Sequence, residues 1–175
     1  EKISFDELSK RSSQVANWLV SLGVKPGDRV GLMVDPSLAF YATLFGIIKT
    51  GAIAVPMFTL FGPDGLRSRV EDSGLRVLVV SEEKSDMAKE LAGIHVSVAD
   101  DAYISNLDMF DTIFSTSSQS SDYAIYQYTS GTTRAVPTAV KHTHLSIVYL
   151  MIAALYATGI RPGDRFFCPS STAWG

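Results

Sequence analysis

Hydrophobic and polar residues follow each other in blocks that predict helices and strands in turn. Ser4 and Glu7 have the spacing of a capping box, in which two side chains satisfy unpaired backbone N–H groups at a helix start. Gly23 and Pro26 are expected to end that helix. Within it apolar residues recur at three- and four-residue steps, whereas the next apolar runs are short and β-branched, as is typical of strands. This alternation continues to Val98.

Turn and cap residues set the bounds of the later elements. Asp35 and Pro36 are expected to start the second helix, Gly51 to end it, and Ser81 to cap the fourth helix. The expected strands are Arg29–Val34, Ala52–Val55, Val77–Val80 and Ile94–Val98, and the expected helices after the first are Leu38–Ile48, Pro63–Ser73 and Ser81–Leu91. Strands that alternate with helices predict an α/β fold, a mostly parallel sheet flanked by helices.

A polar run marks the expected boundary between two lobes. It is Ser115–Ser121, with the sequence STSSQSS, and it divides a first α/β lobe, residues 1–118, from the start of a second lobe, residues 119–175. The second lobe is expected to begin with a strand at Tyr123–Tyr128. The uncharged segment Leu145–Ile160 is 16 residues long, shorter than the ~20 that span a bilayer, so we expect a buried helix there.

Composition and charge exclude several classes of protein. The chain has 175 residues, 46% hydrophobic and 19% charged, which is too apolar for a disordered chain. With 15 Lys and Arg against 18 Asp and Glu, and no basic run, a nucleic-acid partner is not expected. Cys168 is the one cysteine, so neither an intrachain disulfide nor a cysteine-paired zinc site can form, and the three histidines add no metal-ligand pattern. No signal-peptide pattern opens the sequence, so a cytoplasmic location is expected.

One eight-residue segment occurs twice, as GVKPGDRV at Gly23–Val30 and as GIRPGDRF at Gly159–Phe166. In each copy the first glycine can end a helix, and Pro-Gly-Asp can make a turn that the aspartate caps. We interpret the repeat as a helix-to-strand connector used twice rather than as a binding motif.

The stretch with the most chemical information follows the strand at Tyr123–Tyr128. It is the loop Thr129, Ser130, Gly131, Thr132 and Thr133. Gly131 permits backbone torsions closed to other residues, so successive N–H groups can converge on an anion, and four hydroxyls can donate to phosphate oxygens. It is not a Walker loop, because Val136 stands where that motif needs glycine. Ordinary loops share this composition, so the pattern alone leaves both a phosphate site and a plain turn open.

The residues around this loop resemble a known family. Thr-Ser-Gly-Thr-Thr, then Pro137, Ala139–Val140 and His142–Thr143–His144, is similar to the phosphate-loop signature of the acyl-adenylate-forming superfamily, the AMP-dependent acyl-CoA synthetases and ligases. GVKPGDRVGLM, IIKTGAIAVPMFTLFGPDGLRSRVEDSGLRVLVV and SSTAWG look like the front part of that family, in the same order. The resemblance implies that this chain has the fold of the front part of the acyl-CoA synthetase N-terminal domain. It also implies a reaction in which a carboxylate attacks the α-phosphate of ATP, releases pyrophosphate, and passes as acyl-AMP to coenzyme A.

The same resemblance implies roles for individual residues. Thr129, Ser130, Gly131, Thr132 and Thr133 would bind the β- and γ-phosphates of ATP, with Mg²⁺ sharing the charge. Trp174 is similar to the aromatic residue that lines the acyl or nucleotide pocket, although an ordinary core tryptophan is the alternative.

The loop departs from the family pattern directly after Thr133. The usual Gly-x-Pro-Lys-Gly is replaced by RAVPTA, which is one residue longer before the proline and lacks the lysine. We expect Arg134 to supply the missing positive charge, because its guanidinium can bind two phosphate oxygens; Lys141 is the other candidate. A solvated loop arginine remains the alternative for Arg134.

The resemblance also sets what the chain is expected to do by itself. It ends before the family segments that bind adenine and ribose and that carry the C-terminal lysine, so we expect an N-terminal fragment of an acyl-CoA synthetase, itself inactive and able to self-associate. Its partners would be a small-molecule carboxylate, ATP and coenzyme A, with acetate, medium-chain or aromatic acids favoured. A non-catalytic nucleotide-binding or regulatory relative is the alternative that the altered loop favours.

His142 and His144 are assigned no catalytic role. Asp28, Asp122 and Asp164 are interpreted as turn residues.

Overall fold

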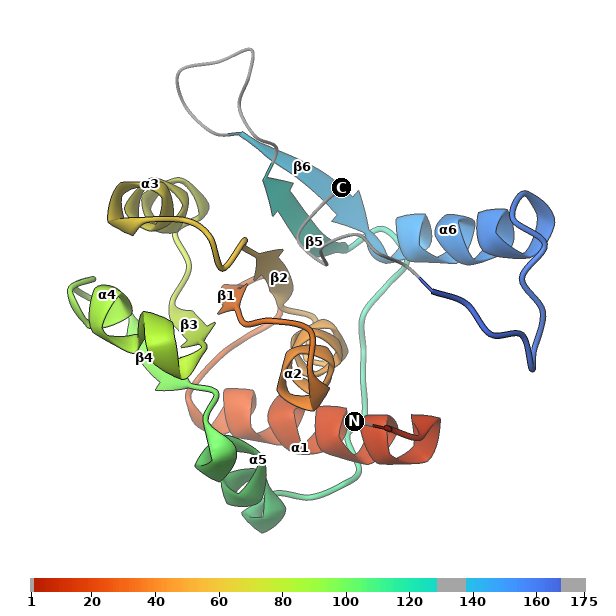
Figure 1. Cartoon of the computed structure of the whole chain (residues 1–175), viewed down its shortest axis with the longest axis horizontal. Helices are drawn as coiled ribbons and strands as arrows, with labels where there is room; N and C mark the ends of the chain where they lie inside the picture. The colour runs from red at the N-terminus through yellow and green to blue at the C-terminus, as the bar shows by residue number, and fades with distance from the viewer. Residues whose placement is uncertain (1, 129–137, 168–175) are drawn as a thin grey trace.

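The computed structural model describes residues 2–128 and 138–167 (Figure 1). Helices and strands alternate along most of the chain. In order they are α1 (Phe5–Ser21), β1 (Arg29–Met33), α2 (Leu38–Lys49), β2 (Ile53–Pro56), α3 (Pro63–Ser73), β3 (Val77–Val80), α4 (Ser85–Lys89), β4 (His95–Val98), α5 (Asp101–Asn106), β5 (Tyr123–Tyr128), β6 (Ala139–Thr143) and α6 (His144–Tyr156).

The described strands form one six-stranded sheet in the order β4-β3-β1-β2-β5-β6. The first five strands in that order run parallel, and β6 pairs antiparallel with β5. This confirms the predicted α/β fold with a mostly parallel sheet flanked by helices. Because β5 pairs with β2 through Ala54 and Ile125, the sheet continues past the polar run at Ser115–Ser121, and a lobe boundary at residue 118 stays a prediction.

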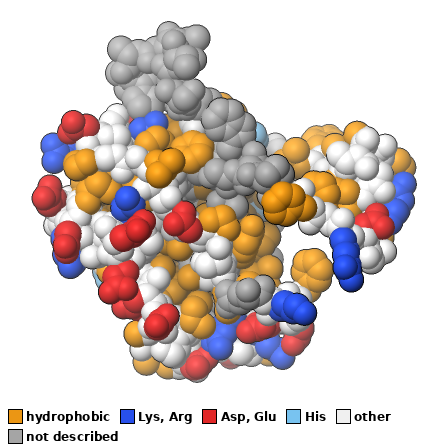
Figure 2. All heavy atoms as spheres, viewed as in Figure 1, with side chains coloured by type: hydrophobic (Ala, Val, Ile, Leu, Met, Phe, Trp, Pro, Cys, Tyr) orange, Lys and Arg blue, Asp and Glu red, His pale blue; other side chains and the backbone are white. Residues whose placement is uncertain are grey.

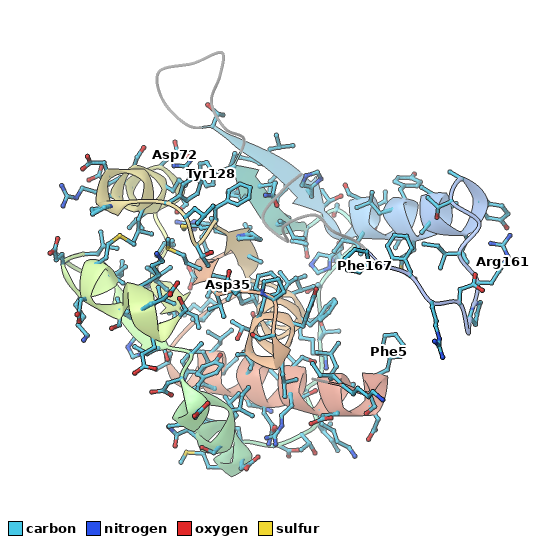
Figure 3. The ribbon with its side chains drawn as sticks, viewed as in Figure 1. Phe5, Asp35, Asp72, Tyr128, Arg161 and Phe167 are labelled. Carbon is cyan, nitrogen blue, oxygen red and sulfur yellow. The ribbon has the colours of Figure 1, made fainter. Side chains whose placement is uncertain are left out.

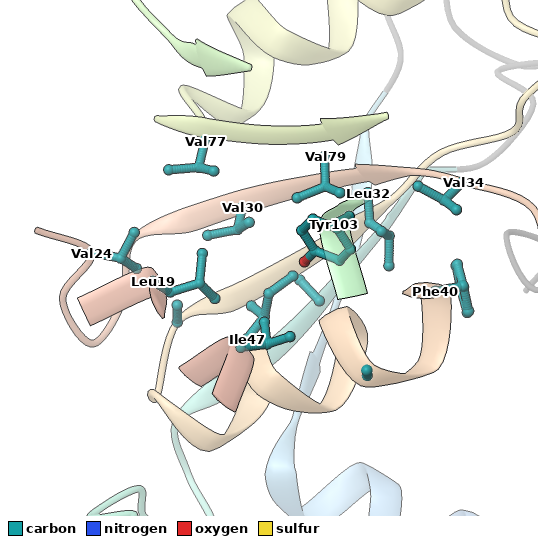
Figure 4. Packing of buried hydrophobic residues seen from close by; sticks show 14 of the residues in the cluster. Leu19, Val24, Val30, Leu32, Val34, Phe40, Ile47, Val77, Val79 and Tyr103 are labelled. Atoms are coloured by element: carbon teal, nitrogen blue, oxygen red, sulfur yellow. The ribbon is translucent and has the colours of Figure 1, made fainter. Parts of the chain in front are cut away.

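Two hydrophobic clusters lie on opposite faces of the sheet. On one face α1, α2 and α5 cover the strands, and Leu19, Ile47 and Tyr103 pack there against Val30 and Val79 (Figure 4). On the other face α3 and α4 cover the strands, and the buried residues of this second cluster are Met33, Val55, Met57, Leu66, Val70, Leu75, Leu78, Val80, Ala88 and Tyr128. All four residues of β3 are buried, as its run of β-branched and aliphatic residues predicts.

The predicted helix caps explain the bounds of α1 and α3. Ser4 Oγ accepts a hydrogen bond from Glu7 N at 3.1 Å, which confirms the helix start. Gly23 has a φ of +80°, and Gly74, directly after α3, has a φ of +59°. Both values lie in the left-handed region that favours glycine, so these positions end their helices as expected.

The predicted cap of α2 is wrong. Ser37, not Asp35, is the N-cap, and its Oγ accepts from Phe40 N at 3.2 Å. Asp35 has another partner, because its carboxylate accepts from Thr59 Oγ1 at 2.8 Å. That bond holds the loop after β2 beside the end of β1.

Three elements differ from the sequence-based expectation. The helix expected from Ser81 to Leu91 is instead a 3-10 turn, Glu82–Lys84, followed by the five-residue α4; only Ala88 of these two pieces is buried, so little packing supports a longer helix. The helix α5 was not predicted, although Asp100 caps it through Tyr103 N at 2.9 Å. The strand β6 was not predicted either.

The helix α6 forms as predicted, but the expectation that it is buried is wrong. Within the described part of the chain none of its residues is buried, and Tyr149 and Tyr156 are 62% and 81% exposed. Figure 1 shows α6 extending beyond β6, away from the sheet, and Figure 2 shows hydrophobic side chains over this part of the surface. The described residues contain no helix of sufficient length and hydrophobicity to cross a membrane.

The two copies of the repeated segment form the same turn. Asp28 Oδ2 accepts from Lys25 N at 2.9 Å, and Asp164 Oδ2 accepts from Arg161 N at 2.7 Å. This confirms the interpretation of both aspartates as turn residues. The first copy leads into β1, whereas residues 165–167, at and directly after the end of the second copy, form no strand.

Candidate functional site

The carboxyl ends of the parallel strands lie at one edge of the sheet, where open α/β proteins bind their ligands. Helix α2 follows β1 on one face, and α4 follows β3 on the other, so the chain leaves these adjacent strands in opposite directions. The loops after β1 and β2 meet at this edge through the Asp35–Thr59 bond, and β5 ends there at Tyr128. Figure 3 marks Asp35, Asp72 and Tyr128 in this region.

The residues predicted to bind phosphate and substrate cannot be placed. Thr129, Ser130, Gly131, Thr132, Thr133 and Arg134 lie outside the described residues, and so does Trp174. The two strands that flank the loop are placed, because Tyr128 pairs with Ala139 in the antiparallel ladder of β5 and β6. The segment between these two residues therefore begins and ends at neighbouring positions, where β5 ends.

Tyr128 is anchored to α3 by its side chain. It is 4% exposed, and its hydroxyl donates to Asp72 Oδ2 at 2.5 Å. Burial raises the pKa of Tyr128, and the hydrogen bond to Asp72 raises it further. The hydroxyl therefore stays protonated, as a donor must, over the pH range in which enzymes work.

Arg69 lies beneath the ring of Tyr128. Its guanidinium carbon is 3.8 Å from the centre of the Phe61 ring and 5.6 Å from that of Tyr128. The side chain is 6% exposed, and it donates from a terminal nitrogen to the Gly65 carbonyl at 2.9 Å. Its Nε is buried without a hydrogen-bond partner in the described part of the protein. Desolvation lowers the pKa of Arg69, but an arginine remains charged at neutral pH.

Sequence reasoning missed this cluster of Arg69, Asp72 and Tyr128. The signal that could have found it is the i, i+3 spacing of Arg69 and Asp72 on one side of α3. Tyr128 is also the residue directly before the predicted phosphate loop. A charged pair on a helix, an aromatic residue at a strand end and an anion-binding loop are three separate patterns, and only the fold brings the first two together.

The other polar residues near the loop have structural partners. Lys141 Nζ lies 5.0 Å from the centre of the Tyr126 ring, in contact range for a cation–π interaction on the β5–β6 hairpin. Asp122 accepts from Gln119 N at 2.8 Å, which confirms its role in a turn. His142 lies in β6, and His144 is the first residue of α6, where its Nε2 is buried without a partner among the described residues.

An open, mostly parallel sheet with helices on both faces defines the doubly wound class of α/β proteins, whose ligands bind at the carboxyl ends of the strands. The sequence matches the family described as AMP-binding enzyme over residues 1–175, and the chain belongs to this family. The match confirms the resemblance to the adenylate-forming acyl-CoA synthetases and ligases.

Individual relatives come from two branches of the family. The chain is 31% identical to the 3-hydroxybenzoate–CoA ligase of Aromatoleum sp. (strain CIB), over 99% of this chain and 35% of the relative. It is 32% identical to bacitracin synthase 1 of Bacillus licheniformis, over 86% of this chain and 3% of the relative. The chain thus spans about a third of the length of the hydroxybenzoate ligase.

A solved structure shares the fold. The anthranilate CoA ligase AuaEII, solved in complex with anthranoyl-AMP, superimposes with a TM-score of 0.80 and 29% identity, over 91% of this chain and 33% of that one. The similarity covers most of the helices and strands described above, so the sheet and its flanking helices are those of an acyl-CoA synthetase.

Proposed function

We propose that the protein containing this chain is an ATP-dependent carboxylate–CoA ligase. It activates a carboxylate as acyl-AMP, releases pyrophosphate, and transfers the acyl group to coenzyme A. The observation that carries the proposal is the family match over the whole chain. The β5–β6 hairpin supports it, because Tyr128 and Ala139, which flank the hydroxyl-rich segment in the sequence, pair where β5 ends.

In this proposal the segment Thr129–Thr133 binds the β- and γ-phosphates of the Mg²⁺ complex of ATP. The departing pyrophosphate concentrates negative charge, and donors already directed at it stabilise the transition state without reorganising. The described residues contain no cluster of three or more His, Cys, Asp or Glu side chains suited to a metal ion. In this proposal Mg²⁺ enters as part of the substrate, bound to the phosphates.

Arg134 is proposed to replace the family lysine. The alternative, Lys141, already has its ammonium over the Tyr126 ring, which supports Arg134. Replacing Arg134 by alanine in the full-length protein should therefore weaken ATP binding, whereas Lys141→Ala should have a smaller effect. Unchanged ATP affinity and rate in the Arg134→Ala variant would reject this role.

The carboxylate is proposed to be small or aromatic, with Trp174 lining its pocket. Relatives named as ligases of 3-hydroxybenzoate and anthranilate support an aromatic acid, and a relative named acetyl-coenzyme A synthetase supports a small one. The 175-residue chain by itself is proposed to form no acyl-CoA. A cytoplasmic location stays a prediction.

The test is an adenylation assay on the longest native protein that contains this chain. Acetate, butyrate, octanoate, benzoate and 3-hydroxybenzoate are offered with ATP, Mg²⁺ and coenzyme A, and both pyrophosphate and acyl-CoA are measured. Acyl-CoA formation from one of these acids supports the ligase, and the best acid identifies the substrate class. Pyrophosphate release without acyl-CoA would reject the transfer step.

A non-catalytic nucleotide-binding relative is the second candidate, and the loop sequence favours it. RAVPTA carries no lysine and one extra residue before Pro137. A protein of this kind would bind ATP at equilibrium but show no ATP–pyrophosphate exchange with any of the five acids.

A further inference from the structure

The end of β5 extends beyond its backbone pairing with β2. The backbone register between β2 and β5 consists of one pair, Ala54 with Ile125, whereas β1 and β2 share four pairs. Beyond Ile125 the ladder of β5 continues only with β6, the other limb of the same hairpin, among the described strands. Backbone pairing with β2 therefore stops short of Tyr128, the last residue of β5.

The side chain of Tyr128 attaches this end of β5 to α3. It reaches from the last residue of β5 to Asp72 near the end of α3, and the bond between them is 2.5 Å long (Figure 3). The ring of Tyr128 also belongs to the hydrophobic cluster that α3 covers. The helix α3 is thereby connected to the residue that directly precedes Thr129.

Arg69 also contacts the ring of Tyr128. Its guanidinium lies between Phe61, in the loop after β2, and Tyr128 at the end of β5. Burying an arginine without a carboxylate partner is costly, and the two aromatic faces and the Gly65 carbonyl offset only part of that cost. The guanidinium lies within cation–π range of both rings, so a movement of either ring away from it would lose a favourable contact.

We propose that Asp72 and Arg69 are positioning residues, which hold Tyr128 and through it set where the phosphate-binding segment starts. This inference rests on the proposed nucleotide-binding role of that segment. It assigns a function in ATP binding to two residues of α3 that need not touch the nucleotide.

The position of Asp72 makes the inference testable without unfolding the protein. Asp72 is on the exposed side of α3, so its replacement leaves no buried cavity. If the Asp72–Tyr128 bond served stability alone, its loss would affect all substrates equally. If it sets the loop, ATP binding should suffer while carboxylate binding does not.

The experiment compares four single variants of the full-length protein and the Asp72→Asn/Tyr128→Phe double variant. Tyr128→Phe removes the bond, and Asp72→Asn weakens it by replacing the charged acceptor with a neutral amide oxygen. Asp72→Glu retains a carboxylate, and Glu71→Gln is the matched control, since it changes the adjacent exposed carboxylate. The readouts are KM for Mg²⁺-ATP, KM for the carboxylate, the equilibrium Kd of ATP by calorimetry, and Tm.

The expected result is selective. Asp72→Asn and Tyr128→Phe should each raise the KM and the Kd for ATP by about 3- to 10-fold, the range that one hydrogen bond supports. The KM for the carboxylate and the Tm should stay near wild-type values. The double variant should be no worse than the single ones, Asp72→Glu should recover part of the loss, and Glu71→Gln should have no effect.

The possible failures are distinguishable. ATP affinity that is unchanged in both variants, or that falls only in step with carboxylate affinity and Tm, overturns the positioning role. A wild-type protein that binds ATP but forms no acyl-AMP rejects the ligase proposal, and the Kd ratios still decide the role of Asp72. A wild-type protein that binds no ATP overturns both.

Discussion

Thr43 and Tyr103 meet inside the core, with 2.8 Å between Thr43 Oγ1 and Tyr103 Oη. Thr43 is fully buried and Tyr103 is 5% exposed, so this bond links α2 to α5 out of contact with water. The Tyr103 ring also meets Trp18 of α1 edge to face, with 5.6 Å between the ring centres. One tyrosine therefore joins the three helices on this face of the sheet.

Tyr103→Phe should lower the free energy of unfolding by about 1–2 kcal/mol, because it leaves the buried Thr43 hydroxyl without a partner. The measurement is urea denaturation followed by tryptophan fluorescence. The double variant Thr43→Val/Tyr103→Phe removes both polar groups and should be more stable than Tyr103→Phe alone. A double variant that is less stable would show that the ring contacts, not the bond, are what Tyr103→Phe disturbs.

The same tyrosine should make stability depend on pH in the alkaline range. Burial raises the pKa of Tyr103 above its value of about 10 in the unfolded chain. A raised pKa in the folded state means that this stabilisation is complete below about pH 10 and is lost as the pH rises further. Unfolding midpoints in urea should fall above that pH, and Tyr103→Phe should flatten the decline. An equal decline in both proteins would assign the pH dependence to other groups.

Gly46 should be intolerant of any side chain, because a Cβ there would lie 2.5 Å from Val15 Cγ1 and 3.0 Å from the Ser12 carbonyl oxygen. Gly46→Ala forces α1 and α2 apart and should destabilise the protein by about 1–3 kcal/mol. Gly65→Ala is the control, since its Cβ would meet Phe61 Cβ at 3.4 Å, near ordinary contact, and alanine favours helix. Thermal unfolding is the measurement. The Tm of Gly46→Ala should fall, whereas the Tm of Gly65→Ala should rise or stay unchanged.

Arg29 should contribute to stability by capping α3 from the neighbouring strand. It donates to the carbonyls of Ser73, Gly74 and Gly27 at 2.8, 2.9 and 3.1 Å, so two carbonyls at the end of α3 receive a charged donor. Arg29→Met should cost about 1–2 kcal/mol, measured by urea denaturation. Arg76→Met, at an exposed arginine nearby, should cost much less; equal losses would mean that the caps contribute nothing.

The 175-residue chain should self-associate through α6. Its exposed apolar residues include Tyr149, Leu150 and Met151, each at least 62% exposed. Sedimentation velocity should therefore give a mass that rises with concentration. A Leu150→Lys/Met151→Lys variant should stay monomeric over the same range. A wild-type chain that stays monomeric throughout would reject this expectation.

Local signals predicted the elements well wherever one strong turn residue set a boundary. Pro63 and Gly74 bound α3 at the predicted residues, and the β-branched run at Val77–Val80 is β3 as expected. The prediction for Asp35 was wrong, although aspartate before proline is a common helix cap. The Asp35 carboxylate instead accepts a hydrogen bond from Thr59, and Ser37 caps the helix.

What could not be predicted depends on contacts between distant parts of the chain. Whether α6 is buried depends on what packs against it, and its sequence, apolar on all sides, does not encode that. The candidate site likewise has one part that the sequence predicts and one part that only the fold creates. The hydroxyl-rich loop is a local motif, but the contact between Asp72 and Tyr128 exists only because the fold brings α3 beside the end of β5.

The place of β5 in the sheet has a consequence for how the protein assembles. Its parallel neighbour is β2, while β3 and β4, which come between them in the chain, join the opposite edge. The pairing of β2 with β5 therefore joins residues far apart in the chain, and pairings across such long separations form slowly. During synthesis this corner of the sheet, where we propose that ATP binds, would be the last part of the sheet to form. A growing chain could then have a packed core before it can bind a nucleotide.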